Sequence, residues 1–156
     1  MNTLRSYSLR ILLFMAIFLP FWLTFGKTLF AEGGWFTVIY LFTIAPLLLV
    51  SLLVVWFLLR SRPDVKQSGR VGTVDATVLL SLYTTIFLHG IFLVDGSDVK
   101  GDSGSIATAV AGISQSLSMG FAIVLFGLSI VLLFSIFMLS LYELWSKKSI
   151  NLRPKA

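Results

Sequence analysis

Four long apolar segments follow one another along the chain, separated by short polar stretches. They cover approximately residues 9–25, 35–59, 74–94 and 117–144. Each is about as long as a helix must be to cross the hydrocarbon core of a bilayer. Apolar and polar residues do not alternate along them, as they would in the strands of a membrane barrel. The pattern therefore predicts an all-α integral membrane protein: one four-transmembrane-helix bundle that takes up residues 1–156 as a single domain.

Composition agrees with this pattern and excludes several classes of function. Of the 156 residues, 57% are hydrophobic and only 12% are charged, and the chain has no Cys and a single His. Thiolate metal sites and a Cys nucleophile are therefore absent, and His89 alone cannot build a metal or haem site. Intramembrane catalysis needs clustered ligands or a nucleophile with a base. We expect no enzymatic activity, no metal and no cofactor.

Basic residues divide unequally between the two sides of the predicted bundle. Ten of the twelve lie in the N-terminal stretch, the loop at residues 60–70 and the C-terminal tail, whereas Lys27 and Lys100 lie on the other side. This positive-inside pattern predicts a bundle with both termini cytoplasmic. It also accounts for the net charge of +5 without nucleic-acid binding. We expect an uncleaved first span and a prokaryotic plasma (inner) membrane.

Two loops carry candidate binding groups. On the predicted inner side, Arg60, Arg62, Lys66 and Arg70 are expected to contact anionic lipid headgroups. On the outer side, the loop at residues 95–105 has three carboxylates separated by glycines. Their spacing does not match an EF-hand loop, so we interpret this loop as solvated and not as a calcium site.

The third predicted helix carries a row of polar side chains. Thr77, Ser81, Thr85 and His89 recur every four residues and form a ridge that is expected to face protein or water and not lipid. Such a ridge is typical of a helix–helix interface.

The two ends of that helix hold further candidate groups. Thr73 is expected to cap the helix, which puts Asp75 in the first turn, where a carboxylate interacts favourably with the helix dipole. Asp75 and His89 also share a face about 21 Å apart along the axis. They are therefore a candidate ion or proton pathway, although the residues between them on that face are mostly apolar.

The last helix is preceded by a stretch rich in small residues. Thr108, Gly112, Ser116 and Gly120 recur every four residues, the small-xxx-small packing pattern that lets membrane helices approach closely. We expect Ile106–Ser116 to form a short outer amphipathic helical segment, continuous with the last span or joined to it by a bend. The third and fourth helices should be antiparallel neighbours, because their connecting loop is of modest length. The two rows then face each other or a partner chain.

These features favour an accessory or assembly subunit of a larger membrane protein complex. Its partners are expected to be lipids and other membrane subunits, or further copies of the chain. The alternative is a small oligomeric channel or transporter for an ion or small solute, which the polar row and Asp75 suggest.

Overall fold

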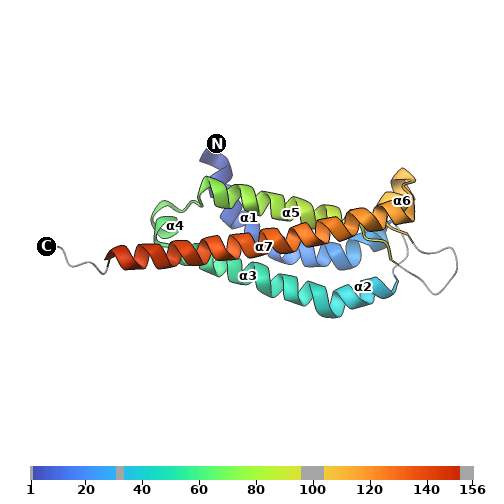
Figure 1. Cartoon of the computed structure of the whole chain (residues 1–156), viewed down its shortest axis with the longest axis horizontal. Helices are drawn as coiled ribbons and strands as arrows, with labels where there is room; N and C mark the ends of the chain where they lie inside the picture. Colours follow the sequence, from blue (N-terminus) through green and yellow to red (C-terminus); the bar gives the residue numbers. More distant parts are fainter. Residues whose placement is uncertain (1, 31–33, 96–103, 152–156) are drawn as a thin grey trace.

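The structure is a computed structural model that describes residues 2–30, 34–95 and 104–151. Over these ranges it is an all-helical bundle whose four long arms run side by side (Figure 1). Four helices are long and apolar enough to cross a membrane, namely Leu9–Gly26, Trp35–Ser61, Thr73–Phe92 and Gln115–Ser146. They overlap the four predicted segments, so the predictions of an all-α fold and of four spans are confirmed.

The spans are built from regular helices and short irregular turns. The first arm consists of α1 (Asn2–Phe21), a π turn (Trp22–Gly26) and a 3₁₀ turn (Lys27–Leu29). The second consists of α2 (Trp35–Ile39), a π turn (Tyr40–Ile44) and α3 (Ala45–Ser61). After the short helix α4 (Pro63–Ser68), the third arm is α5 (Thr73–Phe92). The short helix α6 (Ile106–Ala111) precedes α7 (Gln115–Asn151).

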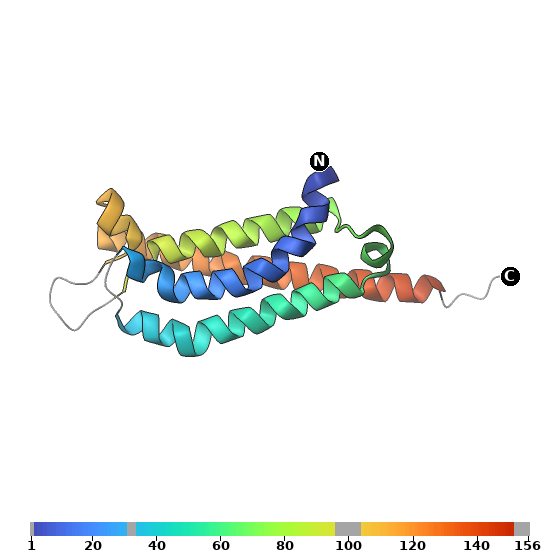
Figure 2. The ribbon, with the colours of Figure 1, turned by 180° about the vertical axis from the view of Figure 1, so that it is seen from behind.

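The helices are arranged so that α1 and α7 lie on opposite faces of the bundle. In Figure 1 α7 lies in front of α1, and Figure 2 shows α1 from behind, between α3 and α5. The most extensive pairing is between α5 and α7, while α1 packs against α3 and α5. The prediction that the third and fourth spans are neighbours is therefore confirmed. Leu12, Leu52 and Leu82, on α1, α3 and α5, are fully buried where the helices meet.

The two prolines within the candidate spans, Pro20 and Pro46, each lie beside a π turn. Pro20 is one residue before the end of α1, and the π turn Trp22–Gly26 follows. Pro46 is the second residue of α3, directly after the π turn Tyr40–Ile44. Proline lacks a backbone N–H and its ring crowds the preceding turn, so the regular hydrogen-bond ladder is interrupted there. The hydroxyl of Thr24 donates to the carbonyl of Pro20 (3.0 Å), four residues earlier.

The first and third arms approach closely at a glycine. The ring of Trp22 stacks on Phe87 with centroids 4.6 Å apart and donates a hydrogen bond to the Phe87 carbonyl (3.0 Å). A Cβ added at Gly90 would lie 2.5 Å from Nε1 of that indole. Only glycine leaves space for the ring at this position.

Two local predictions need correction. Thr73 does not cap α5: the N-cap is Gly72, and Asp75 reaches back to accept the Gly72 N–H (3.2 Å). The segment Ile106–Ser116 is not one helix either. It is helical to Ala111 and again from Gln115, where α7 begins, because Gly112 takes a left-handed conformation (φ 65°) that ends α6, as glycine commonly does at a helix C-terminus.

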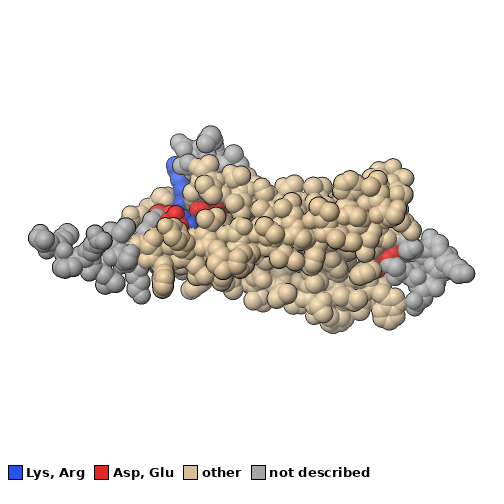
Figure 3. Space-filling model, in the orientation of Figure 1, with Lys and Arg blue, Asp and Glu red and all other residues tan. Residues whose placement is uncertain are grey.

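Charged side chains gather at the ends of the molecule. Figure 3 shows Lys, Arg, Asp and Glu clustered near α4, an acidic patch at the opposite end, and an uncharged surface between them on this face. The spans also carry large apolar side chains that are more than half exposed, such as Phe14, Phe42, Phe57 and Val124. A belt of this kind suits contact with hydrocarbon.

Candidate functional site

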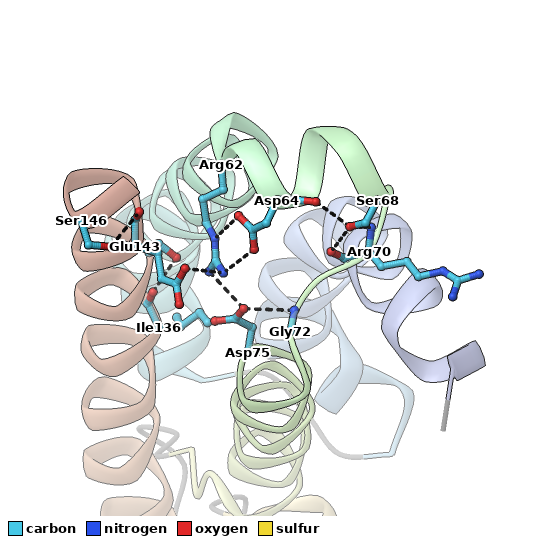
Figure 4. Close-up of polar contacts among 10 residues, drawn as sticks. Arg62, Asp64, Ser68, Arg70, Gly72, Asp75, Ile136, Glu143 and Ser146 are labelled. Carbon is cyan, nitrogen blue, oxygen red and sulfur yellow. Dashed lines mark hydrogen bonds and ion pairs between the residues drawn. The ribbon is translucent and has the colours of Figure 1, made fainter. Parts of the chain in front are cut away.

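The strongest polar cluster surrounds one buried arginine at the α4 end of the bundle (Figure 4). Nη1 of Arg62 lies 3.0 Å from Oδ2 of Asp75, and Nη2 lies 3.0 Å from Oδ2 of Asp64. Nη2 also lies 3.5 Å from Oε2 of Glu143. The side chains of Arg62 and Asp75 are 3% and 7% exposed, whereas those of Asp64 and Glu143 are about one-third exposed (34% and 35%).

The backbone places these four groups from four different parts of the chain. Arg62 lies in an extended conformation between α3 and α4, and Pro63 then starts α4 with Asp64 in its first turn. Asp75 lies in the first turn of α5, and Glu143 belongs to α7. The planar guanidinium presents several N–H donors in fixed directions, so one side chain can pair with several carboxylates. Arg62 therefore ties α4, α5 and α7 together.

The electrostatic balance keeps this arginine charged. Burial alone would lower the pKa of the Arg62 guanidinium. The hydrogen bond to Asp64 and the negative charges of Asp75 and Asp64 outweigh burial and raise that pKa above its ordinary value. A buried charge is tolerated only when it is paired and hydrogen-bonded. The cluster is thus an ion-pair network with its partners in place.

A second cluster lies near the other end of α5, around His89. Nδ1 of His89 lies 2.9 Å from the carbonyl oxygen of Ala122, and Nε2 lies 2.7 Å from the hydroxyl of Tyr40. A carbonyl can only accept, so Nδ1 carries the proton. Nε2 then accepts from the Tyr40 hydroxyl. The contacts select one neutral tautomer and tie α5 to α7 and to the π turn that begins at Tyr40.

Asp95 fixes the start of the second arm. Its carboxylate accepts hydrogen bonds from the backbone N–H groups of Gly34 (2.7 Å), Phe36 (2.8 Å) and Thr37 (3.1 Å), and from the Thr37 hydroxyl (2.6 Å). The backbone groups of Asp95 also exchange two hydrogen bonds with Gly104. The first turn of a helix leaves N–H groups without partners, and a carboxylate there is favoured by the helix dipole. Asp95 is therefore a capping residue.

An apolar groove of about 210 Å³ opens between α3, α5 and α7. Its polar lining consists of Ser51, His89 and Ser129. The two serine hydroxyls donate to carbonyls of their own helices, at 2.7 Å and 2.8 Å, and both nitrogens of His89 are occupied. The groove therefore suits an apolar group, and its polar atoms are already hydrogen-bonded within the chain.

Neither of the two rows predicted from the four-residue spacing forms one continuous surface in the structure. On α5, Thr85 and His89 are buried, but Thr77 and Ser81 are exposed. In the second row, Thr108 lies on α6 and Gly112 ends that helix, whereas Ser116 and Gly120 are exposed on α7. The two rows thus do not face each other within the chain. The residues of α7 that are buried against the bundle include Ser118, Ala122, Ile136 and Ser140.

The four residues predicted to contact lipid headgroups are not all exposed. Arg60, Lys66 and Arg70 are exposed, and the Arg60 guanidinium lies 5.0 Å from the Trp56 ring centre. Arg62 is 2% exposed, so its assignment to lipid headgroups is corrected: its guanidinium pairs with the carboxylates of Asp64, Asp75 and Glu143. In the loop at residues 95–105, Asp98, Lys100 and Asp102 lie outside the described residues.

Asp75 and His89 do not form one site. Each is bonded within its own cluster, and about 21 Å of helix separates them. Val78, Leu82 and Thr85 lie between them on that face; Leu82 is 0% exposed, and the Thr85 hydroxyl donates to the Ser81 carbonyl (2.7 Å). Among the described residues, no chain of polar groups connects the two.

Arg62, Asp95, Tyr40 and Glu143 are the residues whose roles sequence reasoning missed. Signals for some of them exist in the sequence. Tyr40 places a hydroxyl group inside an apolar span, and Glu143 is the first charged residue of the last span. Polar groups at such positions usually have a partner. Nothing in the local sequence, however, distinguishes Arg62 from the exposed Arg60.

We predict that Arg62 contributes strongly to stability because its removal leaves Asp75 buried without a counter-charge. Arg62→Met should lower the free energy of unfolding by about 3–5 kcal/mol. Arg60→Met, at an exposed position, should change it by about 1 kcal/mol or less. Thermal melting in a mild detergent measures both.

A double variant separates charge from packing. Arg62→Met combined with Asp75→Leu removes both buried charges, while Asp64 and Glu143 remain in contact with solvent. This variant should recover much of the lost stability, since an apolar pair can replace a buried ion pair. Equal melting temperatures for Arg62→Met and Arg60→Met would contradict the role assigned to Arg62.

Comparison with known proteins adds no further constraint on these sites. No protein-family model, curated protein or solved structure matches the chain.

Proposed function

We propose that this chain is an accessory or assembly subunit of a larger membrane protein complex and binds its partners through helix–helix contacts. The observation that carries the proposal is the exposure of α7. Only 11% of its most apolar window is buried within the chain, compared with 50% for the span of α5. Although α7 pairs extensively with α5, few residues of this window are buried, so most of its surface is available to a neighbour.

The outward face of α7 has features that favour a helix partner over lipid alone. Ser116, Gly120 and Gly127 fall within about 60° of one another around the helix. A Cβ added at Gly120 or Gly127 would meet no atom within 4 Å. Small residues at such positions allow two backbones to approach closely, which is the main source of helix association in membranes.

The alternative of a channel or transporter has less support. Pathways in membranes are lined by polar groups that can exchange partners. Here His89, Asp75 and Arg62 are held by partners within the chain, and His89 lies beside an otherwise apolar groove. Among the described residues, no group of three His, Cys, Asp or Glu side chains could hold a metal ion. We propose a protein that is not an enzyme and that works without a cofactor.

We further propose that the α4 end of the bundle faces the cytoplasm, across a prokaryotic plasma (inner) membrane. The support is the basic content of the sequence on this side, ten of twelve Lys and Arg residues. Arg60, Lys66 and Arg70 lie exposed at this end. Contact with anionic headgroups would contribute about 1 kcal/mol for each basic residue.

Reporter fusions test the orientation. A reporter after Ala156 should be active on the cytoplasmic side, and one at Ser103 on the outer side. Replacing Arg60, Lys66 and Arg70 by Gln should reduce the anionic lipid that co-purifies, while Arg62 remains unchanged to preserve the buried pairs. A reversed reporter pattern would overturn the proposed orientation. An unchanged amount of co-purifying anionic lipid would contradict the proposed headgroup contacts.

Co-purification tests the proposed function. Extraction in a mild detergent followed by mass spectrometry should recover a reproducible set of unlike membrane proteins. Gly120→Leu should lose that set, because the added side chain holds a neighbouring backbone away. Its melting temperature in the purified state should stay near that of the parent, since no atom of the chain lies within 4 Å of the added Cβ.

Val50→Leu is the matched control, because Val50 is exposed on α3, on a different face of the bundle. It should retain every partner. Recovery of the chain without unlike proteins, or full retention of them in Gly120→Leu, would contradict the proposed subunit role through this face of α7.

A further inference from the structure

The apolar groove between α3, α5 and α7 runs along the helices. Apart from Leu23, its lining residues fall within residues 44–51, 82–89 and 126–133, so the second, third and fourth arms line it over equal lengths. At about 1.5 Å per residue, each of these stretches is about 10 Å long. All of them lie within candidate membrane spans. The groove therefore runs across the hydrocarbon layer, as acyl chains do.

The groove is narrow for its length. A volume of about 210 Å³ along about 10 Å of helix corresponds to a mean cross-section of about 20 Å², which admits one extended hydrocarbon chain. An α-helix with its side chains is about 10 Å across, and pockets for compact ligands usually hold about 300–1,000 Å³. The dimensions therefore suit a single chain better than a helix or a compact solute.

The groove is enclosed on three sides and open on the fourth. Leu82 and Ile86 form a buried floor on α5, whereas Leu47 on α3 and Ile130 on α7 are more than half exposed at the rim. The opening therefore faces the medium around the bundle.

The two walls of the groove are not parallel. In Figures 1 and 2, α3 and α7 lie close together near α4 and diverge toward α2. On the α4 side of the groove, Leu52 and Ile136 are fully buried and close its narrow end. A chain can therefore enter from the α2 end and must stop near Ser51 and Leu133.

The chemistry of the lining selects an apolar occupant. The hydroxyls of Ser51 and Ser129 and both nitrogens of His89 are already hydrogen-bonded within the chain. A polar solute would lose its hydration here without gaining hydrogen bonds in exchange. An empty groove would forfeit dispersion contacts along its whole lining. A hydrocarbon chain supplies those contacts and has no polar group to desolvate.

We propose that the apolar groove holds one acyl chain of a phospholipid from the leaflet at the α2 end of the bundle. The chain enters where α3 and α7 diverge, and its end lies near Ser51 and Leu133. Because the polar atoms of the lining are already bonded, binding depends on the chain and not on the headgroup. The bound chain completes the packing between α3 and α7 at the density of a protein interior.

Lipid binding in the groove is separate from the subunit contact proposed for α7. Ser129 lies about 180° around the helix from Gly120, so the two surfaces are on opposite sides of α7. Lipid binding also needs only the purified chain and no other protein. Failure of either proposal therefore does not imply failure of the other.

Retention of lipid through purification tests the proposal. Native mass spectrometry of the washed protein in a mild detergent should detect one phospholipid per chain. Ser129→Phe places a ring in the groove and should lose this lipid. Ser135→Phe is the matched control, because the Ser135 hydroxyl also donates to a carbonyl of α7. Ser135 does not line the groove and lies about 120° around the helix from Ser129, so this variant should keep the lipid.

Melting temperatures distinguish loss of lipid from loss of folding. Complete removal of lipid should lower the melting temperature of the parent, because a ligand that binds only the folded chain stabilises it. Long-chain phosphatidylcholine should restore the melting temperature, and phosphatidylethanolamine with the same chains should do so equally. Short-chain phosphatidylcholine should not, because its chains do not reach the narrow end. Ser129→Phe should melt cooperatively at a temperature that lipid does not change.

Photo-cross-linking locates the bound chain. Phosphatidylcholine with a diazirine in one acyl chain is bound to the protein, excess lipid is washed away, and the sample is irradiated. The label should appear at Phe126 and Ile130, which line the groove. It should not appear at Val131, which is exposed in the same stretch of α7 but does not line the groove.

Several results would overturn the proposal. These are a parent that retains no phospholipid, equal retention by Ser129→Phe, equal labelling of Val131, or equal stabilisation by short and long chains. Retention of only detergent or free fatty acid would likewise contradict a phospholipid in the groove.

Discussion

Hydrocarbon offers no hydrogen-bond partners, and this constraint accounts for most of the side-chain arrangement inside the bundle. Most Ser and Thr hydroxyls of the spans donate to carbonyls of their own helices, as Thr24 does to Pro20. The imidazole of His89 has a partner at each nitrogen. Backbone groups are satisfied by the helices themselves. Most polar side chains of the described spans are therefore bonded within the chain, with the buried Tyr83 hydroxyl as an exception.

The strongest bonds lie near the two ends of the bundle. At one end Arg62 joins three helices through carboxylates. Toward the other end His89 joins α5 to the second arm and to α7, and Asp95 caps α2. Between the ends the contacts are mostly apolar, and lipid competes with them as an equally apolar solvent. The polar clusters are thus the contacts that select one arrangement of helices over others.

The pairing of the polar clusters within the chain also bears on function. A channel needs polar groups that water or an ion can reach, whereas here the strongest ones are held by partners inside the chain. What the bundle leaves open is surface, above all the outward side of α7. This surface is suited to contacts with other helices, which is why we favour a subunit role over transport.

The sequence predicted the number of spans, their approximate bounds and the position of Asp75 in a first turn. These features follow from hydropathy and from the dipole of a single helix, so they need no knowledge of neighbours. The row Thr77, Ser81, Thr85 and His89 was predicted to share a surface, but it does not. Each four-residue step turns by about 40°, so the row winds about 120° and passes from the outside of α5 into the core.

Other features depend on contacts that the local sequence does not contain. Arg62 is buried because Glu143 and Asp75 come from distant parts of the chain, whereas Arg60, two residues earlier, is exposed. Gly112 fits two patterns equally, close helix packing and a left-handed helix end. The structure selects the second, and this divides the predicted row of small residues between α6 and α7.

The central claim is that the side chains of Arg62, His89 and Asp95 have their polar partners within the chain, and His89 tests it most directly. The imidazole nitrogens of a labelled protein can be observed by NMR in lipid bilayers. The structure predicts one neutral tautomer, with the proton on Nδ1, a hydrogen-bonded Nε2 and slow exchange with water. Tyr40→Phe should change the Nε2 signal and leave Nδ1 almost unchanged. A charged ring, a mixture of tautomers or rapid exchange with water would contradict the account and indicate that water reaches His89 inside the bundle.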